Sequence, residues 1–394
     1  MANVSSSNGL EKRPKLRFPG FDGPYKQCRI GDIYAERSQR GASDMELLSV
    51  TMNDGVKPRS EIEGKDNSSE DKSNYKIVRK GDMVYNSMRM WQGANGISPC
   101  DGIVSPAYTV LMPKQEINNG YFAALFKSAN LINEFRKNSQ GMTSDTWNLK
   151  YPQIETIKIQ IPSVSEQDKV SELFGVLDAR IVAQAQLVES LKKYKRGVNN
   201  QILSQIDNSY NCRLGSVCEI VGGGTPDTLH TEYWGNTVEW FTPSEIGKTK
   251  YVNNSVRKLS DIGLNNSSAK LLPIGTVLLT TRATLGEMSI AKRECSTNQG
   301  FQSLIPHTDR VSSEYLYYMQ IIIKPWCEKY ASGNTFREIS KSALSDCIVP
   351  IPDRARQEQI VKLLSSIDML IGAEESILMS LSKIRHGLMQ QLFI

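Results

Sequence analysis

Two stretches of the chain carry a heptad pattern of apolar residues, one in the middle and one at the C-terminus. In each stretch, two apolar positions four residues apart recur every seven residues over about five heptads, which is the pattern of a coiled-coil helix. The seam residues are Val170, Phe174, Leu177, Ile181, Val188, Leu191, Val198 and Ile202 in the first stretch, and Ile360, Leu364, Ile367, Ile371, Leu378, Leu381, Leu388 and Leu392 in the second. The pattern therefore predicts two long helices.

The second stretch repeats the first at an offset of 190 residues, and each copy follows an Ile-Pro pair. The polar interruptions of the seam coincide too, Gln184 with Glu374 and Lys195 with Arg385. Polar residues inside an apolar seam weaken helix pairing but fix its register. We therefore expect the two helices to pair with each other. The alternative is two amphipathic helices that lie separately on globular cores.

The stretches ahead of the helices repeat more weakly. Short motifs recur in the same order in both halves: Arg29-Ile30-Gly31-Asp32-Ile33 and Arg213-Leu214-Gly215-Ser216-Val217, Lys80-Gly81-Asp82-Met83-Val84 and Ile274-Gly275-Thr276-Val277-Leu278, and Gly141-Met142-Thr143 and Gly333-Asn334-Thr335. These repeats indicate a tandem duplication, with a variable domain and then a long helix in each half.

This order predicts a mixed α+β fold in which two α/β domains are joined by two long helices. We expect the helices to form an intramolecular antiparallel coiled coil with pseudo-two-fold symmetry, because a whole domain separates them and equivalent halves favour equivalent packing. The expected segments are a mostly extended basic arm at 1–24, a variable domain at 25–160, the central helix at 161–208, a second variable domain at 209–350 and the C-terminal helix at 351–394. In the first variable domain we expect strands at Tyr75–Val78, Met83–Asn86 and Tyr108–Leu111 and a helix at Tyr121–Asn138.

Composition limits the class of protein. A chain of 394 residues is too long for one small core, and 23% charged with 39% hydrophobic residues is ordinary for a globular protein. The sequence lacks a transmembrane run and a signal peptide, and its seven cysteines include no Cys-x-x-Cys pair. We therefore expect a cytoplasmic protein without a zinc site or disulfide framework. The net charge of +5 permits an anionic partner without requiring one.

The chain lacks recognisable catalytic motifs. Gly247-Lys248-Thr249 comes nearest to a phosphate-binding Walker A loop, but Thr242 replaces its first glycine. We find no Asn/Asp-Pro-Pro-aromatic methyltransferase motif and no Gly-x-Gly-x-x-Gly cofactor loop, and the three histidines stand in unrelated contexts. Gly222-Gly223-Gly224 fits either a close approach to a phosphate or a tight turn after a strand. We expect no enzyme and no metal site in this chain.

Several motifs carry a family resemblance. In the second half they are Gly223-Gly224-Thr225-Pro226, Trp240-Phe241-Thr242-Pro243, Gly275–Gly286 and Asn298-Gln299-Gly300-Phe301, and the long helices open with Ser165-Glu166-Gln167 and Arg356-Gln357-Glu358-Gln359. The first half has its own version in Tyr85–Gly93 and Gly102–Tyr108 but lacks the Gly-Gly-Thr-Pro turn. From about residue 25 to residue 394, the chain resembles the specificity (S) subunit of a type I restriction–modification enzyme, a phage-defence system.

The resemblance implies a function. Each variable domain would be a target recognition domain that reads one half of an asymmetric, interrupted site in double-stranded DNA. The paired helices would space the two halves and dock two methyltransferase (modification) subunits, through which the restriction subunits join. The S subunit would be non-catalytic, with S-adenosylmethionine, ATP and Mg on the partner subunits and no cofactor on this chain. The alternatives are a stand-alone DNA methyltransferase or nuclease with fused recognition domains, and a coiled-coil scaffold that does not bind DNA.

Candidate DNA contacts follow from side-chain chemistry. Arg reads guanine and Asn or Gln reads adenine through paired hydrogen bonds, whereas Lys, Ser and Thr mostly hold phosphates. The candidates are Lys57, Arg59, Asn86, Ser87, Arg89, Trp91, Gln92 and Lys137 in the first domain, and Thr225, Thr280, Thr281, Arg282, Thr284, Asn298, Gln299 and Arg337 in the second. For Arg89 and Arg282 the alternative role is to brace a loop. Lys137 and Arg337 fit a phosphate contact and a solvated charge equally well.

Overall fold

The computed structural model describes residues 2–3, 14–41, 44–52, 55–66, 68–282, 284–333 and 337–393. The chain divides into two compact units, Met1–Ala185 with Ser376–Ile394 (unit 1) and Gln186–Glu375 (unit 2). Most of the expected N-terminal arm, including Lys12 and Arg13, lies outside the described residues, as do Asn334 and Thr335 of the last repeated motif.

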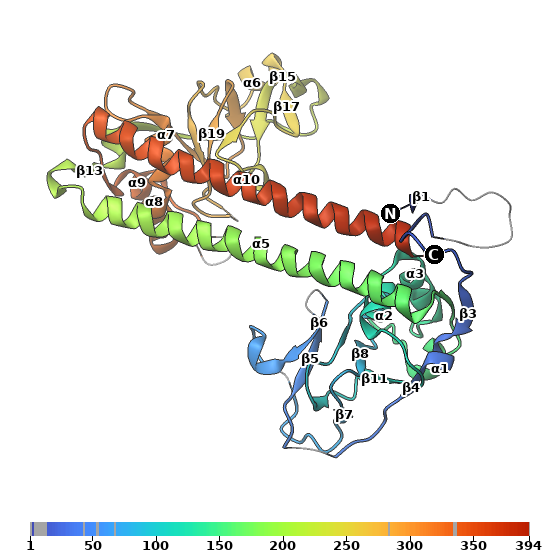
Figure 1. The fold of residues 1–394 in the computed structure, drawn as a ribbon. Helices are drawn as coiled ribbons and strands as arrows, with labels where there is room; N and C mark the ends of the chain where they lie inside the picture. The colour runs from blue at the N-terminus through green and yellow to red at the C-terminus, as the bar shows by residue number, and fades with distance from the viewer. Residues whose placement is uncertain are drawn as a thin grey trace. The chain divides into compact units, whose positions relative to one another are not determined.

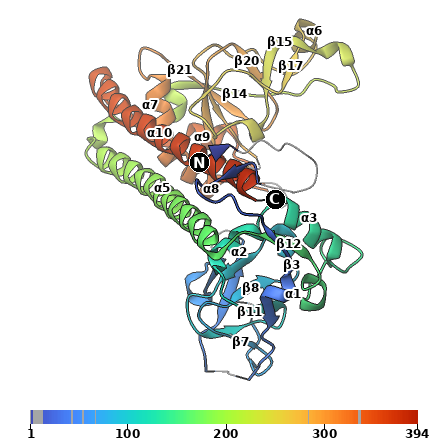
Figure 2. The same ribbon diagram turned by 45° about the vertical axis from the view of Figure 1, so that its right-hand side comes forward.

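Unit 1 contains the first variable domain. Among its described residues, a four-stranded antiparallel sheet has the order β4 (Tyr34–Glu36), β11 (Tyr108–Pro113), β8 (Met83–Asn86) and β9 (Asn95–Ile97). Three strand pairs accompany it: β3 (Lys26–Arg29) with β12 (Lys158–Ile161), β5 (Leu48–Thr51) with β6 (Gly55–Pro58), and β7 (Lys76–Val78) with β10 (Gly102–Val104). A short pair, β1 (Ala2–Asn3) and β2 (Leu16–Arg17), precedes them. Figure 2 shows β3 and β12 beside each other at the end of this domain.

Short helices complete the first domain. They are α1 (Ile30–Ile33), α2 (Asn119–Leu125), α3 (Ala129–Asn138) and α4 (Tyr151–Ile154), with 3-10 turns η1 (Arg59–Glu61) and η2 (Met90–Gln92). The three expected strands are present as β7, β8 and β11. The prediction of a single helix over Tyr121–Asn138 was wrong. Helix α2 ends at Leu125, and Ser128 caps the start of α3 by accepting a hydrogen bond from the Leu131 N–H.

Unit 2 contains the second variable domain. Its five-stranded sheet has the order β14 (Cys218–Gly222), β21 (Gln302–Pro306), β18 (Val277–Leu279), β19 (Met288–Ala291) and β16 (Tyr251–Val252). A three-stranded sheet joins β17 (Arg257–Leu259), β15 (Trp234–Phe241) and β20 (Cys295–Thr297), and β13 (Asn211–Arg213) pairs with β22 (Ile348–Pro350). The helices are α6 (Asp261–Asn265), α7 (Ser313–Tyr318), α8 (Gln320–Tyr330) and α9 (Lys341–Ser345), and the 3-10 turns are η3 (Asn208–Tyr210), η4 (Leu214–Ser216), η5 (Thr231–Tyr233) and η6 (Pro243–Glu245).

The repeated motifs occupy matching places in the two domains. Gly81 precedes β8 and Gly275 precedes β18, both with a left-handed backbone (φ 90° and 88°) that disfavours side chains. β8 pairs antiparallel with β11, as β18 does with β21. The first and last strands of each domain also pair antiparallel, β3 with β12 and β13 with β22. The weak sequence repeats therefore mark a shared structural plan.

Two long helices run through both units. α5 (Val164–Ser204, 41 residues) contributes its first part to unit 1 and the remainder to unit 2, whereas α10 (Arg354–Leu392, 39 residues) contributes its first part to unit 2 (Figure 1). All seam residues are buried or half-buried. Val170, Phe174 and Leu392 join the core of unit 1, and Ile202, Ile360 and Leu364 join that of unit 2. The helix seams are thus part of each domain's core.

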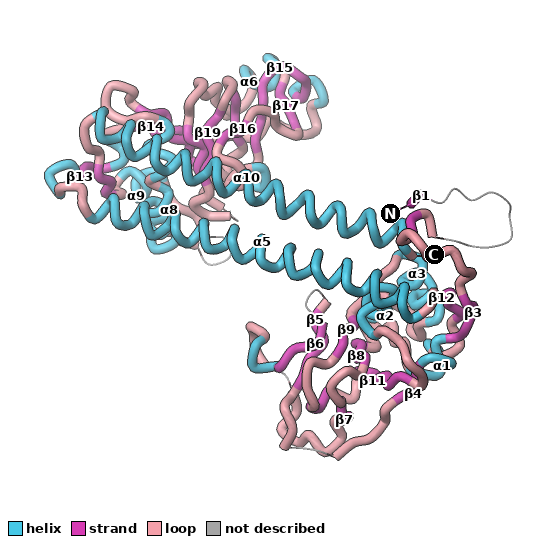
Figure 3. Tube along the Cα trace, viewed as in Figure 1, coloured by secondary structure: helices cyan, strands magenta, loops and turns pink. Residues whose placement is uncertain are grey.

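Contacts within each unit show that the helices are antiparallel. In unit 1, Phe174 stacks on Phe393 at 5.7 Å, and the Arg385 guanidinium binds both oxygens of Asp178. In unit 2, Lys192 pairs with Glu375 at 2.9 Å and Lys195 with Asp368 at 2.5 Å. In both units, later α5 residues meet earlier α10 residues. The predicted mixed fold with two long, paired antiparallel helices is confirmed (Figure 3).

Candidate nucleic-acid interface

In each variable domain one loop carries most of the candidate DNA contacts, and we call this loop the candidate edge of the domain. In the first domain it is the loop that follows β8. Asn86 ends the strand, and its side-chain oxygen accepts a hydrogen bond from the Met88 N–H at 3.0 Å, which turns the chain. Gly93 ends the following 3-10 turn with φ 85°. The Trp91 indole donates to the Met88 carbonyl at 3.1 Å and packs edge-on against Trp147 at 5.2 Å. The tryptophans therefore fix the loop from which Arg89 projects.

Arg89 and Gln92 are the freest polar side chains of this loop. Arg89 is exposed and makes one long contact of 3.4 Å to the Gln92 side-chain oxygen. Ser87, in contrast, is 4% exposed, and its hydroxyl pairs with that of Thr109 at 2.8 Å. Ser87 is thus buried and braces the start of the loop.

The upstream candidates lie on the β5–β6 hairpin and just after it. The Arg59 guanidinium donates to the carbonyls of Ile62, Gly64 and Lys65 at 2.6–2.9 Å and lies 3.7 Å from Asp66. With this set of partners, Arg59 holds its own loop and has little capacity left for DNA. Lys57 is half-buried on β6. On α3, the exposed Lys137 pairs with Glu134 at 2.8 Å, as a solvated charge would.

The second candidate edge is the loop that follows β18. The Thr280 side chain is fully buried, bonds the Thr284 carbonyl and accepts from the Glu287 N–H at 3.0 Å, so it closes the loop. Thr281 is also fully buried. Arg282 is half-exposed, and its Nε donates to Glu338 at 2.8 Å. Thr280 and Thr281 are therefore supports, and Arg282 and the exposed Thr284 are the side chains that this loop displays.

Two further segments meet this loop. A Cβ on Gly223 would lie 1.9 Å from the Asn298 carbonyl, so only glycine fits there. Next to it, the exposed Thr225 bonds the side chain of Gln299, and Asn298 accepts from the Gly300 N–H at 2.9 Å. The glycine run thus makes a close turn against Asn298, which favours the turn interpretation over the phosphate one. Arg337, also exposed, donates to the Glu328 carbonyl.

The two edges correspond. The Ser87 N–H donates to the Ala107 carbonyl at 3.3 Å, just before β11, and the Thr281 N–H donates to the Gly300 carbonyl at 2.8 Å, just before β21. The loop after β8 and the loop after β18 therefore stand at equivalent ends of equivalent strand pairs, β8 with β11 and β18 with β21. Polar side chains that can read base edges project from both loops, and they differ between the domains.

Two side-chain clusters near the candidate loops were not predicted from the sequence, the Trp91–Trp147 pair and the packing of Arg257 on Trp234 and Trp240. Trp147 was missed because it stands 56 residues after Trp91, its packing partner. Arg257 lies 3.5 Å above the ring of Trp234 and also faces Trp240, whose indole donates to the Gly224 carbonyl at 3.0 Å. The signal was slight in both cases: isolated tryptophans near polar loops.

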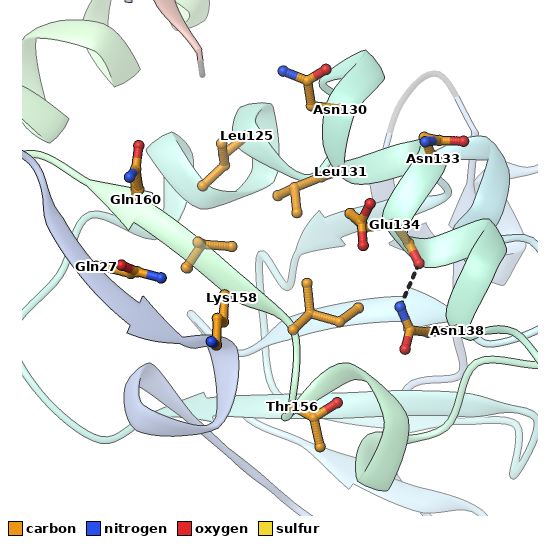
Figure 4. Close-up of a pocket in the computed structure, with 12 residues that line it drawn as sticks. Gln27, Leu125, Asn130, Leu131, Asn133, Glu134, Asn138, Thr156, Lys158 and Gln160 are labelled. Carbon is orange, nitrogen blue, oxygen red and sulfur yellow. Dashed lines mark hydrogen bonds between the residues drawn. The ribbon is translucent and has the colours of Figure 1, made fainter. Parts of the chain in front are cut away.

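The described residues contain no group of three or more histidine, cysteine, aspartate or glutamate side chains placed to hold a metal. None of the described helices combines the length and apolar character needed to cross a bilayer. A cavity of about 690 Å³ lies between β12 and α3 of unit 1. Figure 4 shows its lining, with Lys158 and Gln160 on one side and Asn130, Asn133 and Asn138 on the other. None of the candidate DNA contacts lines it.

Comparison with known proteins identifies the class. The family described as "Type I restriction modification DNA specificity domain" matches residues 25–208 and again 207–383. The chain is 34% identical over 186 residues to the type I restriction enzyme MjaIX specificity subunit of Methanocaldococcus jannaschii, covering 46% of this chain and 43% of that protein. It is 26% identical over 234 residues to the EcoR124I/EcoR124II specificity subunit of Escherichia coli, covering 55% and 57%. The matches thus span about half the length of these curated relatives.

Two solved structures share the fold. One belongs to work on the "complex assembly" and "conformational transition of the type I R-M system", and it aligns with TM-score 0.61 and 17% identity over 96% of this chain and 99% of that one. The other is a type I restriction–modification S subunit from M. genitalium, with TM-score 0.58 and 15% identity over 97% and 99%. Both alignments include the two variable domains and both long helices of this chain, given their coverage.

Proposed function

Because the chain belongs to the type I restriction–modification DNA specificity family, we propose that it is the DNA-reading subunit of such a complex. It binds double-stranded DNA and carries no catalytic centre of its own. Methylation and cleavage belong to partner subunits, which hold S-adenosylmethionine, ATP and Mg. The complex acts in the cytoplasm on a site with two separate halves.

The observation that carries this proposal is the pair of equivalent loops, one after β8 and one after β18. Arg89 and Gln92 project from the first, where Asn86 caps the turn, and Arg282 and Thr284 project from the second beside Thr225, Asn298 and Gln299. Arginine and amide side chains recognise base edges in the major groove. Since the two loops carry different side chains, the two half-sites differ and the whole site is asymmetric.

The remaining candidates have simpler roles in this proposal. Lys57, Lys137 and Arg337 contact phosphates, which adds affinity without sequence preference. Ser87, Thr280, Thr281, Arg59 and Trp91 hold the loops in shape. Arg282 is held by Glu338 in the free protein, so base reading exchanges the carboxylate for a guanine edge.

The long helices act as spacer and docking surface. Each long helix exposes two apolar side chains that are one heptad apart, Leu187 and Tyr194 on α5 and Ile377 and Ile384 on α10. The two pairs correspond at the 190-residue offset, and we call each pair an apolar strip. Unpartnered apolar side chains at equivalent places fit two copies of one partner. The partner is the methyltransferase subunit, one at each strip, and restriction subunits join through it.

DNA binding tests the proposal directly. The purified chain with its methyltransferase subunits should shift duplex DNA, and the isolated chain should show no methyl transfer. Sequencing of methylated bases in the host with and without this gene should reveal one bipartite motif that depends on the gene. Methyl transfer by the isolated chain would instead support a self-contained enzyme, and absence of DNA binding would support a scaffold.

Native mass spectrometry tests the docking. The wild-type chain should carry two methyltransferase subunits. Leu187→Asp or Ile377→Asp should each remove one, and the double variant should remove both. Val256→Asp, at a residue that is 87% exposed and outside the helices, is the matched control and should keep two. One methyltransferase subunit or none on the wild-type chain would contradict the docking model.

A further inference from the structure

A second polar cavity lies wholly within unit 2, where the second domain meets α5. It has a volume of about 870 Å³. Its cations are Lys192, Lys195 and Arg196 of α5, Lys248 of the loop after η6, and Lys324 of α8. Its carboxylates are Glu287, Glu328 and Asp368. With five cations and three carboxylates, the lining has an excess of positive charge.

Two of these cations have no partner among the described residues of the chain. Lys195 pairs with Asp368, Lys192 with Glu375, and Lys324 with Glu287 at 2.5 Å. Among the residues that the structure describes, Arg196 and Lys248 are exposed and form no hydrogen bond or ion pair. A charge left unpaired in a concave, basic lining attracts anions.

The cavity also holds an unmet hydrogen-bond acceptor. Asn199 is 5% exposed, and its Nδ2 donates to the Tyr318 carbonyl at 3.1 Å. Its side-chain oxygen has no hydrogen-bond partner in the described structure. A water molecule can donate one hydrogen to this oxygen and the other to a bound anion.

The internal duplication shows which of the cavity residues on α5 recur on α10. At the 190-residue offset, Lys195 corresponds to Arg385, and both pair with an aspartate of the other helix. The other three cavity residues of α5 correspond to residues of a different type on α10. Lys192, Arg196 and Asn199 correspond to Ser382, His386 and Met389. The basic lining is therefore particular to unit 2.

The cavity adjoins the candidate DNA edge of the same domain. The loop that begins with Thr280, Thr281 and Arg282 ends at Glu287, which lines the cavity. Gln320 of α8 donates to the Gly286 carbonyl of that loop at 3.0 Å. The cavity lining therefore adjoins the loop that carries Arg282.

We propose that this cavity binds phosphate groups of the DNA backbone that flank the half-site read by the second domain. Arg196 and Lys248 make the contacts, and the paired lysines raise the local positive potential. This assignment rests on the proposed function and deepens it, because it adds a phosphate contact from the helix that separates the domains. At the equivalent places α10 carries Ser382, His386 and Met389, so in this proposal the long helices contact the DNA backbone beside the second domain.

The salt dependence of binding tests this proposal. The full-length chain with its methyltransferase subunits is titrated with a random-sequence duplex at graded salt. Each phosphate contact contributes about 0.9 to the slope of log affinity against log salt concentration. Arg196→Gln and Lys248→Gln should each lower the slope by about 0.9, and the double variant by roughly twice that. Lys362→Gln, an exposed lysine of α10 outside the cavity, should leave the slope unchanged.

The possible results distinguish failure of the cavity assignment from failure of the proposed function. If the wild-type complex does not bind duplex DNA, the proposed function itself fails. If it binds and both variants keep the wild-type slope, only the cavity assignment fails. A free nucleotide is the other source of phosphate, and titration with ATP in the absence of DNA distinguishes it. Binding of ATP that the double variant loses, together with an unchanged DNA slope, would overturn the assignment to DNA.

Discussion

Gln167 and Gln357 stand 190 residues apart and make two equivalent hydrogen bonds, and Gln357 also donates to the Arg310 carbonyl at 2.8 Å. Each is 1% exposed. The amide nitrogen donates to the proline carbonyl five residues earlier, Pro162 at 3.1 Å or Pro352 at 2.9 Å. The amide oxygen accepts from the N–H of the residue that caps a domain helix, Asn118 of α2 at 3.0 Å or Ser312 of α7 at 3.1 Å.

These glutamines lock each long helix onto the domain that precedes it. Gln167→Ala and Gln357→Ala should each destabilise the protein by about 1–3 kcal/mol, because a buried N–H and carbonyl lose their partner. Thermal unfolding of the full chain measures the loss. Gln201→Ala, on an exposed face of α5, is the control and should be nearly neutral. Equal stability of all three variants would contradict the role of the buried amides.

Arg89 should determine sequence preference at one half-site. If it reads guanine, Arg89→Ala should cost about 1–3 kcal/mol of discrimination at one base pair. Binding competition between single-base variants of the DNA site measures this loss. Lys137→Ala, at an exposed residue that pairs with Glu134, should reduce affinity slightly and equally for all sequences. A uniform loss in the Arg89 variant would assign this side chain to the backbone.

The two domains should be exchangeable separately. Replacing residues 26–150 by the equivalent domain of another specificity subunit should change one half of the DNA site, and replacing 212–345 should change the other. The reason is that each recognition loop stands on its own sheet within its own unit, so contributions of the domains add. Methylated-base sequencing reads both halves at once. A swap that altered both would show that the domains read DNA jointly.

The helices should set the spacer. α5 has 41 residues, which is about 60 Å at roughly 1.5 Å per residue and limits the half-sites to about 18 base pairs apart. We expect half-site centres about one DNA turn apart, near 10 base pairs. Inserting four residues after Ala185 and after Glu375 should lengthen the unread spacer and keep the bases read, since four residues nearly preserve the seam. A folded, active variant with the original spacer would exclude the helices as the ruler.

Glu239 should make the second domain sensitive to acid. Burial alone would raise its pKa, but hydrogen bonds from Lys258 at 2.7 Å and from Ser255 outweigh burial, so the pKa lies below the usual 4.5. A lowered pKa stabilises the folded state above pH 4.5, and this contribution is lost as the pH falls through the lowered value.

Unfolding measured across this range checks the sign. Glu239→Gln should reduce stability at neutral pH and flatten its fall below pH 4.5. Glu219→Gln, at an exposed carboxylate on β14, is the control and should leave stability at neutral pH nearly unchanged. A Glu239→Gln profile as steep as that of the wild-type chain would show that another group controls the acid transition.

Local patterns in the sequence were enough to determine the helices and the duplication. The seam repeats every seven residues, and the same contacts recur along its length, so periodicity alone predicts pairing. The polar interruptions at Lys195 and Arg385 were also readable, and each pairs with an aspartate. The candidate DNA contacts of each domain fell largely on one loop, because the motif residues there are consecutive in the chain.

Only the tertiary structure decided which of those loop residues face outward. Ser87, Thr280 and Thr281 looked like contacts, yet they are buried. Ser87 pairs with Thr109 of β11, Thr280 accepts from the Glu287 N–H at the other end of its loop, and the Thr281 N–H donates to the Gly300 carbonyl just before β21. Arg17 looked like part of a basic arm, yet it is 7% exposed and pairs with Glu166 of α5, 149 residues away. Burial and pairing between distant segments depend on how strands and helices pack, and no short window of sequence contains that packing. The chain's own pattern thus predicts its elements and their repeat, whereas packing decides which candidate side chains are buried and which are exposed.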